Sequence, residues 1–304
     1  MKPYFSTVLT RLFLLAVLAS AGLFTTACKK DAPEIKDYSG IDQETIIKYL
    51  ADNNITTAQK QPSGLYFLPV RTNPTGTKVT VGSAVAVLFT GHLLDAAGTV
   101  FDASSMRTNP LLSFVLGAGQ TPPGFEEGIS LMHVGDKAEL LLPSALAFGP
   151  ASGKNLPANS VVRFEVEIID VPVYDDNLLT SYLAAKNITT AQKQASGLYF
   201  LPVTTNPSAA RPVIGNTVTV QYTGHFFDAT GKVFDASTAN SPLVFKYGTN
   251  RLVPGFEEGI ALMHKGDKAE LLLPSALAYG AQGSSGSIGP NTAIRFEVEV
   301  VDIK

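Results

Sequence analysis

Short stretches of the chain alternate hydrophobic and polar residues, which is the pattern of a strand with one buried face. In one stretch Val218, Val220 and Tyr222 would share a face, with Thr219 and Gln221 on the other. Two further stretches repeat the pattern, with inward residues Phe164, Val166 and Ile168 in one and Phe296, Val298 and Val300 in the other. Because one face of each strand would be exposed to solvent, the pattern predicts an antiparallel sheet.

The chain also repeats itself over long segments. Residues 54–70 recur as residues 187–203 with one change, and residues 124–149 recur as residues 255–280 with three changes among 26 positions. These repeats indicate a tandem duplication of a whole domain, because the repeated unit is far longer than a solenoid repeat.

Three segments show helical spacing. The first follows Asp42, a predicted N-cap, and the second follows Asp176 or Asn177. The third is a short helix over residues 256–263, with two glutamates in its first turn, where the helix dipole favours negative charge. Its counterpart is expected in the other copy. The fold class predicted is therefore α+β: in each copy a curved antiparallel sheet wrapped on one short helix, with a leader helix in front.

The duplication predicts two domains, residues 41–172 and residues 173–304. The joint over residues 171–176 combines a proline with acidic residues after a predicted strand. At about 150 residues per domain, each copy is long enough to bury its own core.

Composition narrows the possible functions. The 304 residues are 45% apolar and 16% charged, with a net charge of −3. A mildly acidic chain lacks the basic face expected of a general nucleic-acid binder, so no nucleic-acid partner is expected. The single cysteine excludes an internal disulfide framework and every multi-cysteine metal site.

The N-terminal segment is typical of a targeting signal. Residues 1–27 combine a basic start, a short apolar run and small residues before Cys28, the only cysteine. This resembles a bacterial lipoprotein signal, in which the cysteine becomes the acylated N-terminus. Thr25 stands where leucine is common, and an ordinary signal peptide with an incidental thiol is the alternative. Residues 28–40 are polar and are expected to form a tether.

Six blocks of the second copy occur in a specific order: VTVQYTG, GKVFDAS, PLVFKYG, LVPGFEEGIALMHKGDKAELLLP, ALAYG and IRFEVEVVDIK. In this order and spacing they resemble the FKBP-type peptidyl-prolyl cis-trans isomerases over the whole unit. The resemblance implies a half-open antiparallel sheet around a short helix. It also implies an activity without nucleophile, metal or cofactor, because only rotation about an X-Pro amide is accelerated.

The resemblance further implies a pocket in the second copy. The residues implied to be catalytic are Asp235, Tyr222, Tyr279 and Phe234, and those implied to bind substrate are Phe245, Leu252, Val253, Phe256, Ile288 and Phe296. The backbone N–H of Val253 would donate to the bound peptide or macrolide. Phe256 stands where the family usually has tryptophan, and Asn240 stands where it often has arginine.

The equivalent pocket of the first copy is altered. The residues implied to line it are Phe89, Phe101, Asp102, Phe114, Pro122, Phe125, Phe148, Leu156 and Phe164. Both tyrosines have become phenylalanines, Phe89 and Phe148, and Pro122 has no N–H to give at the donor position. Arg107 stands five residues beyond Asp102, as in the family. We expect catalysis mainly in domain 2, while domain 1 binds prolyl or apolar segments weakly or only packs.

Some of these residues have simpler interpretations. Asp235 could cap a turn, and the tyrosines could be interface rings. The four histidines are far apart in the sequence without a cysteine partner, so we expect them at solvated surface positions rather than around a metal. Ser144 and Ser275 lack a Gly-x-Ser-x-Gly elbow, which disfavours a serine hydrolase.

The function predicted is a peptidyl-prolyl cis-trans isomerase that assists the folding of exported proteins, working without a cofactor. The alternative is a non-catalytic chaperone or a lipoprotein that binds prolyl segments. The expected partners are unfolded or proline-containing polypeptides, macrolide inhibitors, and a membrane reached through the lipid anchor. The expected location is the cell envelope.

Overall fold

The computed structural model describes residues 37–153, 155–249, 251–284 and 287–304. The predicted signal peptide, Cys28 and most of the predicted tether lie outside the described residues. Within the described ranges, no helix has the length and apolar character needed to cross a bilayer.

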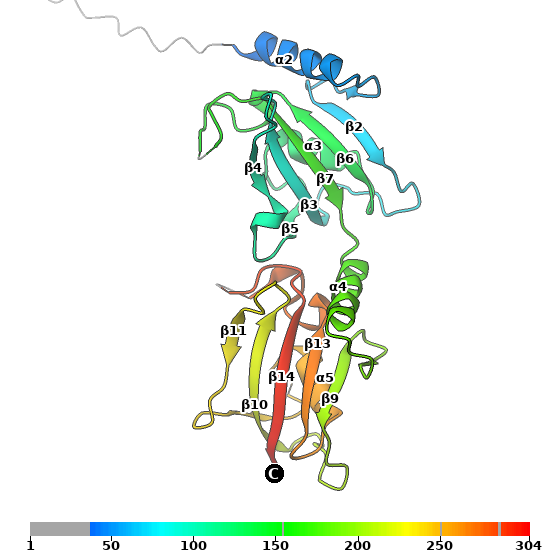
Figure 1. Ribbon diagram of the computed structural model, residues 1–304, viewed down its shortest axis with the longest axis vertical. Coiled ribbons are helices and arrows are strands. Elements are labelled where there is room, and N and C mark those ends of the chain that lie inside the picture. Colours follow the sequence, from blue (N-terminus) through cyan, green and yellow to red (C-terminus); the bar gives the residue numbers. More distant parts are fainter. Residues whose placement is uncertain (1–36, 154, 250, 285–286) are drawn as a thin grey trace, which may run out of the picture. The chain divides into compact units, whose positions relative to one another are not determined.

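Domain 1 is a seven-stranded antiparallel sheet with the order β1-β2-β6-β7-β3-β4, in which β5 also pairs with β3 (Figure 1). Its strands are β1 Gln59–Lys60, β2 Tyr66–Arg71, β3 Ala84–Leu93, β4 Val100–Ala103, β5 Leu112–Val115, β6 Lys137–Leu142 and β7 Val162–Ile168. Its helices are α2 Ser39–Asp52 and α3 Pro123–Ser130, with the 3-10 turns η1 Ser104–Met106 and η2 Ser144–Leu146.

Domain 2 repeats this topology with the order β11-β10-β14-β13-β9-β8, in which β12 also pairs with β10. Its strands are β8 Gln192–Lys193, β9 Tyr199–Thr204, β10 Thr217–Phe226, β11 Val233–Ala236, β12 Leu243–Lys246, β13 Lys268–Leu273 and β14 Ile294–Ile303. Its helices are α4 Val171–Ala185 and α5 Pro254–Ala261, with the 3-10 turns η3 Ser275–Leu277 and η4 Gly280–Gln282. The predicted α+β fold, present twice, is confirmed.

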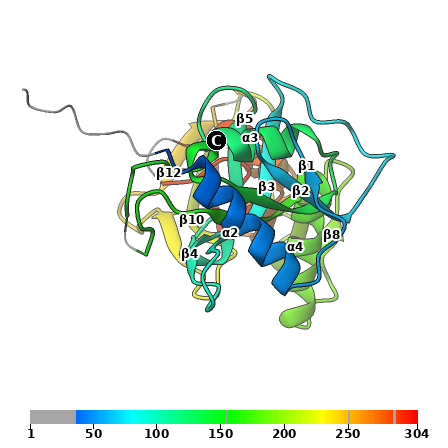
Figure 2. The same cartoon turned by 90° about the horizontal axis from the view of Figure 1, so that it is seen from above.

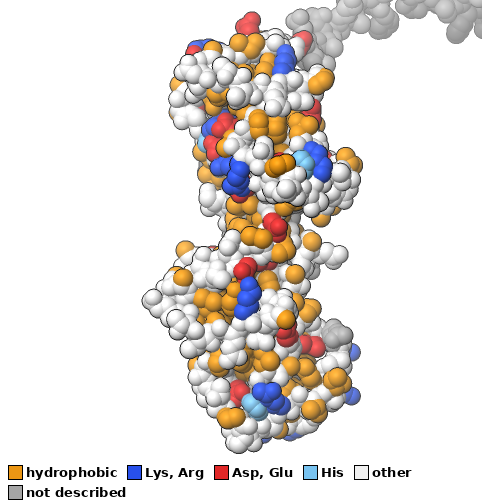
Figure 3. Space-filling view, turned by 90° about the vertical axis from the view of Figure 1, so that its right-hand side faces the viewer, with side chains coloured by type: hydrophobic (Ala, Val, Ile, Leu, Met, Phe, Trp, Pro, Cys, Tyr) orange, Lys and Arg blue, Asp and Glu red, His pale blue; other side chains and the backbone are white. Residues whose placement is uncertain are grey.

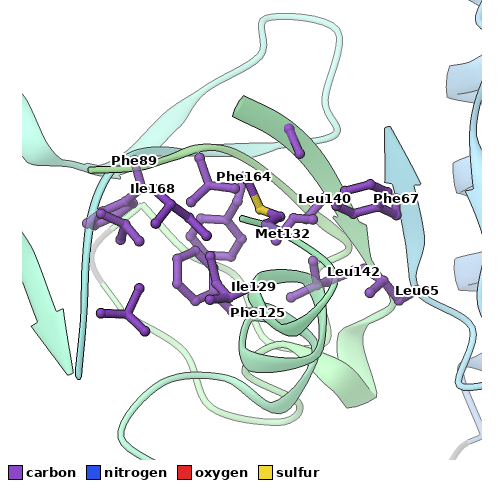
Figure 4. Close-up of a cluster of buried hydrophobic side chains, with 14 of the residues drawn as sticks. Leu65, Phe67, Phe89, Phe125, Ile129, Met132, Leu140, Leu142, Phe164 and Ile168 are labelled. Carbon is purple, nitrogen blue, oxygen red and sulfur yellow. The ribbon is translucent and has the colours of Figure 1, made fainter. Parts of the chain in front are cut away.

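The short helix of each domain packs directly on its sheet. In domain 1, Phe125 and Ile129 of α3 point at Phe164 and Leu140 of the sheet, as Figure 4 shows. A side chain at Gly128 would place its Cβ 2.5 Å from Leu140, so only glycine permits this approach. Gly259 meets Leu271 in the same way at 2.4 Å in domain 2. The close packing buries the rings that later form the floor of the site.

The leader helices cover the opposite face of the sheet. Figures 1 and 2 show α2 beside the sheet of domain 1. Ile46 of α2 packs in one cluster with Tyr66 and Leu141, whereas Leu65 and Leu140 belong to the cluster that contains Ile129 of α3. Residues 66–68 of β2 and 140–142 of β6 are therefore buried on both faces. This is why these parts of the two strands read as continuous apolar runs instead of alternating ones.

The predicted starts of three helices need correction. Helix α2 begins at Ser39 after Tyr38, so Asp42 lies inside its first turn. Helix α4 begins at Val171, and Asp170 is the N-cap residue, so the predicted caps Asp176 and Asn177 also lie inside the helix. The predicted boundary between residues 172 and 173 consequently falls in the first turn of α4. Helix α5 begins two residues before the predicted start, with proline at its first position.

Acidic and basic side chains are interspersed on the face of the described residues drawn in Figure 3. No broad surface of one sign is seen on that face.

Candidate functional site

Four aromatic rings from four elements meet in domain 2. Phe256 of α5 lies 5.0 Å from Phe296 of β14, at an interplanar angle of 80°. Tyr222 of β10 lies 5.8 Å from Phe256, and Phe234 of β11 lies 5.7 Å from Phe296. These edge-to-face contacts fix the rings relative to one another. The structure therefore brings together four of the residues predicted for the pocket.

A glycine of β10 makes room for these rings. A Cβ on Gly224 would lie 2.5 Å from Phe234 and 2.9 Å from Phe296. The pairing of β10 with β11 shifts register just after this glycine. A residue with a side chain at this position would push Phe234 out of the cluster, and Gly91 has the same role in domain 1, beside Phe101.

The carboxylate at the edge of the rings has a phenol partner. The Tyr222 hydroxyl donates to Oδ2 of Asp235 at 2.6 Å, and Oδ1 of Asp235 accepts from the N–H of Ala236 at 2.9 Å. Asp235 thus caps its own turn, as the simpler interpretation has it, and also holds the phenol.

The two tyrosines of the candidate site, Tyr222 and Tyr279, remain protonated over a wide pH range. Burial, followed by the hydrogen bond and charge of Asp235, raises the pKa of Tyr222 strongly. Burial, followed by the charge of Asp235, raises the pKa of Tyr279. Tyr279 directly precedes η4, and 36% of it is exposed, so it lies at the rim of the site.

The predicted backbone donor lies at the start of α5. Val253 is the residue before the first helical position, with φ −62° and ψ 140°, and Pro254 follows. Among the described residues, none accepts a hydrogen bond from the N–H of Val253. Leu252 and Val253 pack, half-buried, against the core of domain 2.

The two remaining predicted pocket residues of domain 2 are buried. Phe245 of β12 is 8% exposed and Ile288 is 5% exposed, and both belong to the core cluster that contains Phe256 and Phe296. Ile288 is held by a bridge to Ser284, whose N–H donates to the carbonyl of Ile288 at 2.8 Å.

Domain 1 builds the same ring cluster. Phe125 lies 5.0 Å from Phe164, Phe101 lies 5.6 Å from Phe164, and Phe89 lies 6.3 Å from Phe125. Phe114 completes the inner wall at 6.1 Å from Phe125. The rings enclose a cavity of about 180 Å³, lined by Phe89, Phe101, Asp102, Arg107, Leu112, Gln120, Thr121, Pro122, Phe125, Phe148 and Phe164.

The polar groups of the domain 1 cavity differ from those of domain 2. Phe89 has no hydroxyl, and Asp102 is instead held by Arg107, whose Nη2 lies 2.6 Å from Oδ2. The guanidinium of Arg107 also lies 4.9 Å from the centre of the Phe89 ring. The carboxylate of domain 1 is therefore paired with an arginine, whereas that of domain 2 is paired with the phenol of Tyr222.

The donor position of domain 1 keeps its backbone shape without its N–H. Pro122 precedes α3 with φ −54° and ψ 142°, close to the angles of Val253. Phe148 occupies the position of Tyr279 and meets Phe101 edge-to-face at 5.7 Å. Leu156 is half-buried against the core and is bridged to Gly153, just as Ile288 is bridged to Ser284. Domain 1 has thus kept the apolar shape and lost three directional donors.

Two supporting residues were missed at the sequence level. Ser237 accepts the N–H of Tyr222 on its hydroxyl at 2.8 Å, and Ser104 does the same for Phe89 at 3.0 Å. The block FDAS, which occurs in both copies, was the available signal. Glu126, in the first turn of α3 where the helix dipole favours negative charge, also accepts the N–H of Gly117 at 2.7 Å and so holds the loop before the helix.

The prediction of solvated histidines is wrong for His92 and His225. The side chain of His92 is 14% exposed and that of His225 is 13% exposed, and each Nε2 lies within 3.5 Å of a glutamate. Their Nδ1 atoms meet the carbonyls of Gly98 and Gly231 across the neighbouring turns. No group of three or more metal-ligating side chains that could hold a metal ion occurs among the described residues.

Comparison with known proteins follows the duplication. Residues 75–169 and 208–301 each match the family of FKBP-type peptidyl-prolyl cis-trans isomerases. The FK506-binding protein 2 of Candida glabrata is 38% identical over 122 residues, which are 38% of this chain and 88% of that protein. Peptidyl-prolyl cis-trans isomerase FKBP10 of Mus musculus is 26% identical over 225 residues, which are 74% of this chain and 35% of that protein. The chain therefore matches about a third of the length of the mouse relative.

Among solved structures, FkpA from Escherichia coli is similar at 31% sequence identity and a TM-score of 0.39. The similarity covers 44% of this chain and 60% of that one.

Proposed function

The chain belongs to the family of FKBP-type peptidyl-prolyl cis-trans isomerases, and from this premise we propose that domain 2 accelerates X-Pro rotation in exported polypeptides. The observation that carries the proposal is the set of polar groups around the domain 2 rings. Tyr222, hydrogen-bonded to Asp235, meets Phe256 edge-to-face, and Val253 directly precedes the helix that carries Phe256, so a peptide resting on the Phe256 ring would lie beside these polar groups.

The mechanism needs no chemical step on the protein. Rotation about an X-Pro bond is slow because the amide must lose its resonance, a barrier of about 18–20 kcal/mol. The planar amide is the more polar state, and water stabilises it. A water-poor pocket of rings favours the twisted state, and fixed donors orient the carbonyls on either side. Phe234, Phe256 and Phe296 would supply the apolar surroundings. The Tyr279 hydroxyl and the Val253 N–H would supply the donors, while the Tyr222 hydroxyl holds Asp235.

For domain 1 we propose binding of prolyl or apolar segments with little catalysis. Its cavity of about 180 Å³ keeps the rings but lacks both hydroxyls and the N–H. Each lost hydrogen bond in a desolvated pocket costs about 1–3 kcal/mol. A segment would therefore be held mainly by apolar contact, without the phenol and backbone donors that domain 2 has.

The test compares matched variants of the full chain. Tyr222→Phe with Asp235→Ala removes the polar pair of domain 2, and Asp102→Ala gives domain 1 the same side chains at both positions. The readout is cis-trans exchange of an X-Pro peptide, followed by NMR or by a coupled protease. We expect the first variant to lose most of the acceleration, together with its inhibition by a macrolide, and the second to keep both. Equal losses of acceleration in the two variants would contradict the proposal that domain 2 catalyses while domain 1 only binds.

A holding chaperone is the alternative, and the paired domains give it a physical basis because two linked sites bind one long segment more tightly than either alone. Refolding of a proline-limited substrate and suppression of aggregation separate the two functions. If the Tyr222→Phe, Asp235→Ala variant loses refolding acceleration but suppresses aggregation as well as the wild type, both functions are present. If refolding acceleration is unchanged, domain 2 is not an isomerase.

We also propose that Cys28 is acylated and anchors the chain in the cell envelope. The small residues before this single cysteine and the polar segment after it support the proposal. Acyl chains stabilise membrane binding by about 0.8 kcal/mol for each buried methylene. Mass spectrometry of the mature protein tests it: an acylated Cys28 at the N-terminus is expected, and a free thiol in the membrane-bound fraction would exclude it.

A further inference from the structure

A buried hydrogen-bond pair joins the leader helix of domain 2 to the segment that carries Tyr279. Oδ2 of Asp175 accepts the N–H of Ser275 at 2.7 Å and its hydroxyl at 2.6 Å. Asp175 and Ser275 are each 1% exposed. Burial of a carboxylate costs free energy unless it is hydrogen-bonded, so the two hydrogen bonds from Ser275 stabilise the buried position of Asp175.

Ser275 is the first residue of the segment that forms one wall of the site. It begins η3, which is followed by Ala278, Tyr279 and then η4. The N–H of Asn291 closes the far end of this wall on the carbonyl of Gly280 at 2.8 Å. The position of Ser275 therefore helps to set the position of the Tyr279 side chain.

The leader helix does not need Asp175 to stay in place. Leu179 and Leu183 of α4 are buried against Tyr199, Leu201 and Leu272 on the outer face of the sheet. Loss of the carboxylate would leave the helix docked by these contacts. What would be lost is the acceptor that fixes Ser275.

One partner of this contact lies outside the residues that match the family. The second match covers residues 208–301, whereas Asp175 belongs to α4, which ends at Ala185. Domain 1 holds the same contact between Asp42 and Ser144, at 2.8 Å to the N–H and 2.6 Å to the hydroxyl. There the segment leads to Phe148, which has no hydroxyl to place.

We propose that Asp175 is a positioning residue for the domain 2 site, holding Tyr279 at the rim through Ser275. The functional unit of domain 2 then includes the leader helix. This inference rests on the proposed isomerase activity of domain 2, and its test separates the failure of one from the failure of the other.

The experiment uses the full chain with Asp175→Ala, Asp175→Asn and Asp42→Ala. Asparagine keeps an oxygen that can accept both bonds from Ser275, whereas alanine keeps none. Asp42→Ala removes the equivalent carboxylate in domain 1, where Phe148 stands in place of Tyr279. Isomerisation of an X-Pro peptide gives kcat/KM, and amide hydrogen exchange over residues 276–283 reports the wall directly.

We expect Asp175→Ala to lower kcat/KM by about tenfold, less than the roughly 100-fold cost of moving a reacting group by 1 Å. Exchange over residues 276–283 rises while exchange in β13 and β14 is unchanged. Asp175→Asn restores both readouts, and Asp42→Ala lowers thermal stability without lowering kcat/KM.

Two results would overturn the proposal: wild-type kcat/KM in Asp175→Ala, or exchange that rises equally throughout domain 2. If the wild type itself does not accelerate isomerisation, the proposed function fails. The exchange data then decide whether Asp175 positions the wall, and unchanged exchange over residues 276–283 rejects it.

Discussion

The hydroxyl of Tyr222 and the carboxylate of Asp235 form a 2.6 Å hydrogen bond that domain 1 replaces with an ion pair of the same length. In domain 1, Arg107 holds Asp102 and lies over the Phe89 ring. Asn240 stands in domain 2 at the position of Arg107. Each domain thus keeps one of two partners for its carboxylate, a neutral phenol in domain 2 and a charged guanidinium in domain 1.

This exchange of partners predicts a partial rescue. Tyr222→Phe should lower kcat/KM for X-Pro isomerisation about fivefold, the effect of one hydrogen bond worth about 1 kcal/mol. Adding Asn240→Arg rebuilds the domain 1 pair and should hold Asp235 in place again, recovering part of the loss. Peptide NMR exchange measures both variants. A double variant no better than Tyr222→Phe would show that the phenol acts on the substrate alone.

The backbone donor can be removed without changing the backbone. Val253 has φ −62°, which proline adopts freely, and Pro122 occupies the equivalent position in domain 1. Val253→Pro should therefore fold and should weaken macrolide or peptide binding by about 1–3 kcal/mol, or about five- to 150-fold. Titration calorimetry on the full chain measures the change.

Val253→Ala is the control for that variant, because it keeps the N–H while it trims the side chain. Equal affinities of the proline and alanine variants would show that the N–H does not contact the ligand.

Sequence reasoning succeeded where the determinant is local. The alternation in β7 and β14 shows one wet face, and the repeated block PGFEEGI fixes the short helix and the close approach of Gly128 and Gly259 to the sheet. The ordered blocks of the second copy placed the aromatic residues that meet around Phe256. These features depend on neighbours in the sequence or on patterns shared by both copies.

The failures depend on partners far along the chain. Asp42 looks like an N-cap because it precedes an apolar helical run, yet its carboxylate accepts from Ser144, 102 residues away. His92 and His225 look solvated because they are polar, but their strand positions direct them at glutamates on the adjacent strands β7 and β14. No local pattern records either contact.

The pKa of Asp175 predicts how the stability of domain 2 depends on pH. Burial raises this pKa, an effect that the hydrogen bonds from Ser275 only partly offset. The folded state therefore binds the proton more tightly than the unfolded state, whose carboxyl titrates near pH 3.9. The contribution of Asp175 is complete below about pH 3.9 and is lost as pH rises through the raised pKa.

Asp175→Asn removes this titration. The free energy of unfolding of domain 2 should fall more steeply with rising pH in the wild type than in the variant, from about pH 4 upward. Urea unfolding followed by NMR signals assigned to domain 2 gives both curves. A difference between them that is constant from pH 3 to pH 7 would contradict the raised pKa.

Replacing the buried glycines of the short helices by alanine should destabilise the protein, although helix propensity alone predicts that alanine stabilises a helix. Alanine is favoured over glycine inside an exposed helix by about 1 kcal/mol. At Gly259, however, the added Cβ would lie 2.4 Å from Leu271, so overpacking should dominate and Gly259→Ala should destabilise domain 2 by about 1–3 kcal/mol. Gly128→Ala should do the same to domain 1.

Gly40→Ala in α2 is the control, because the added Cβ would meet no atom within 4 Å, and this variant should be neutral or stabilising. Denaturation followed by signals assigned to each domain measures all three variants. If Gly259→Ala matched Gly40→Ala, the packing of α5 on β13 would be looser than the structure shows.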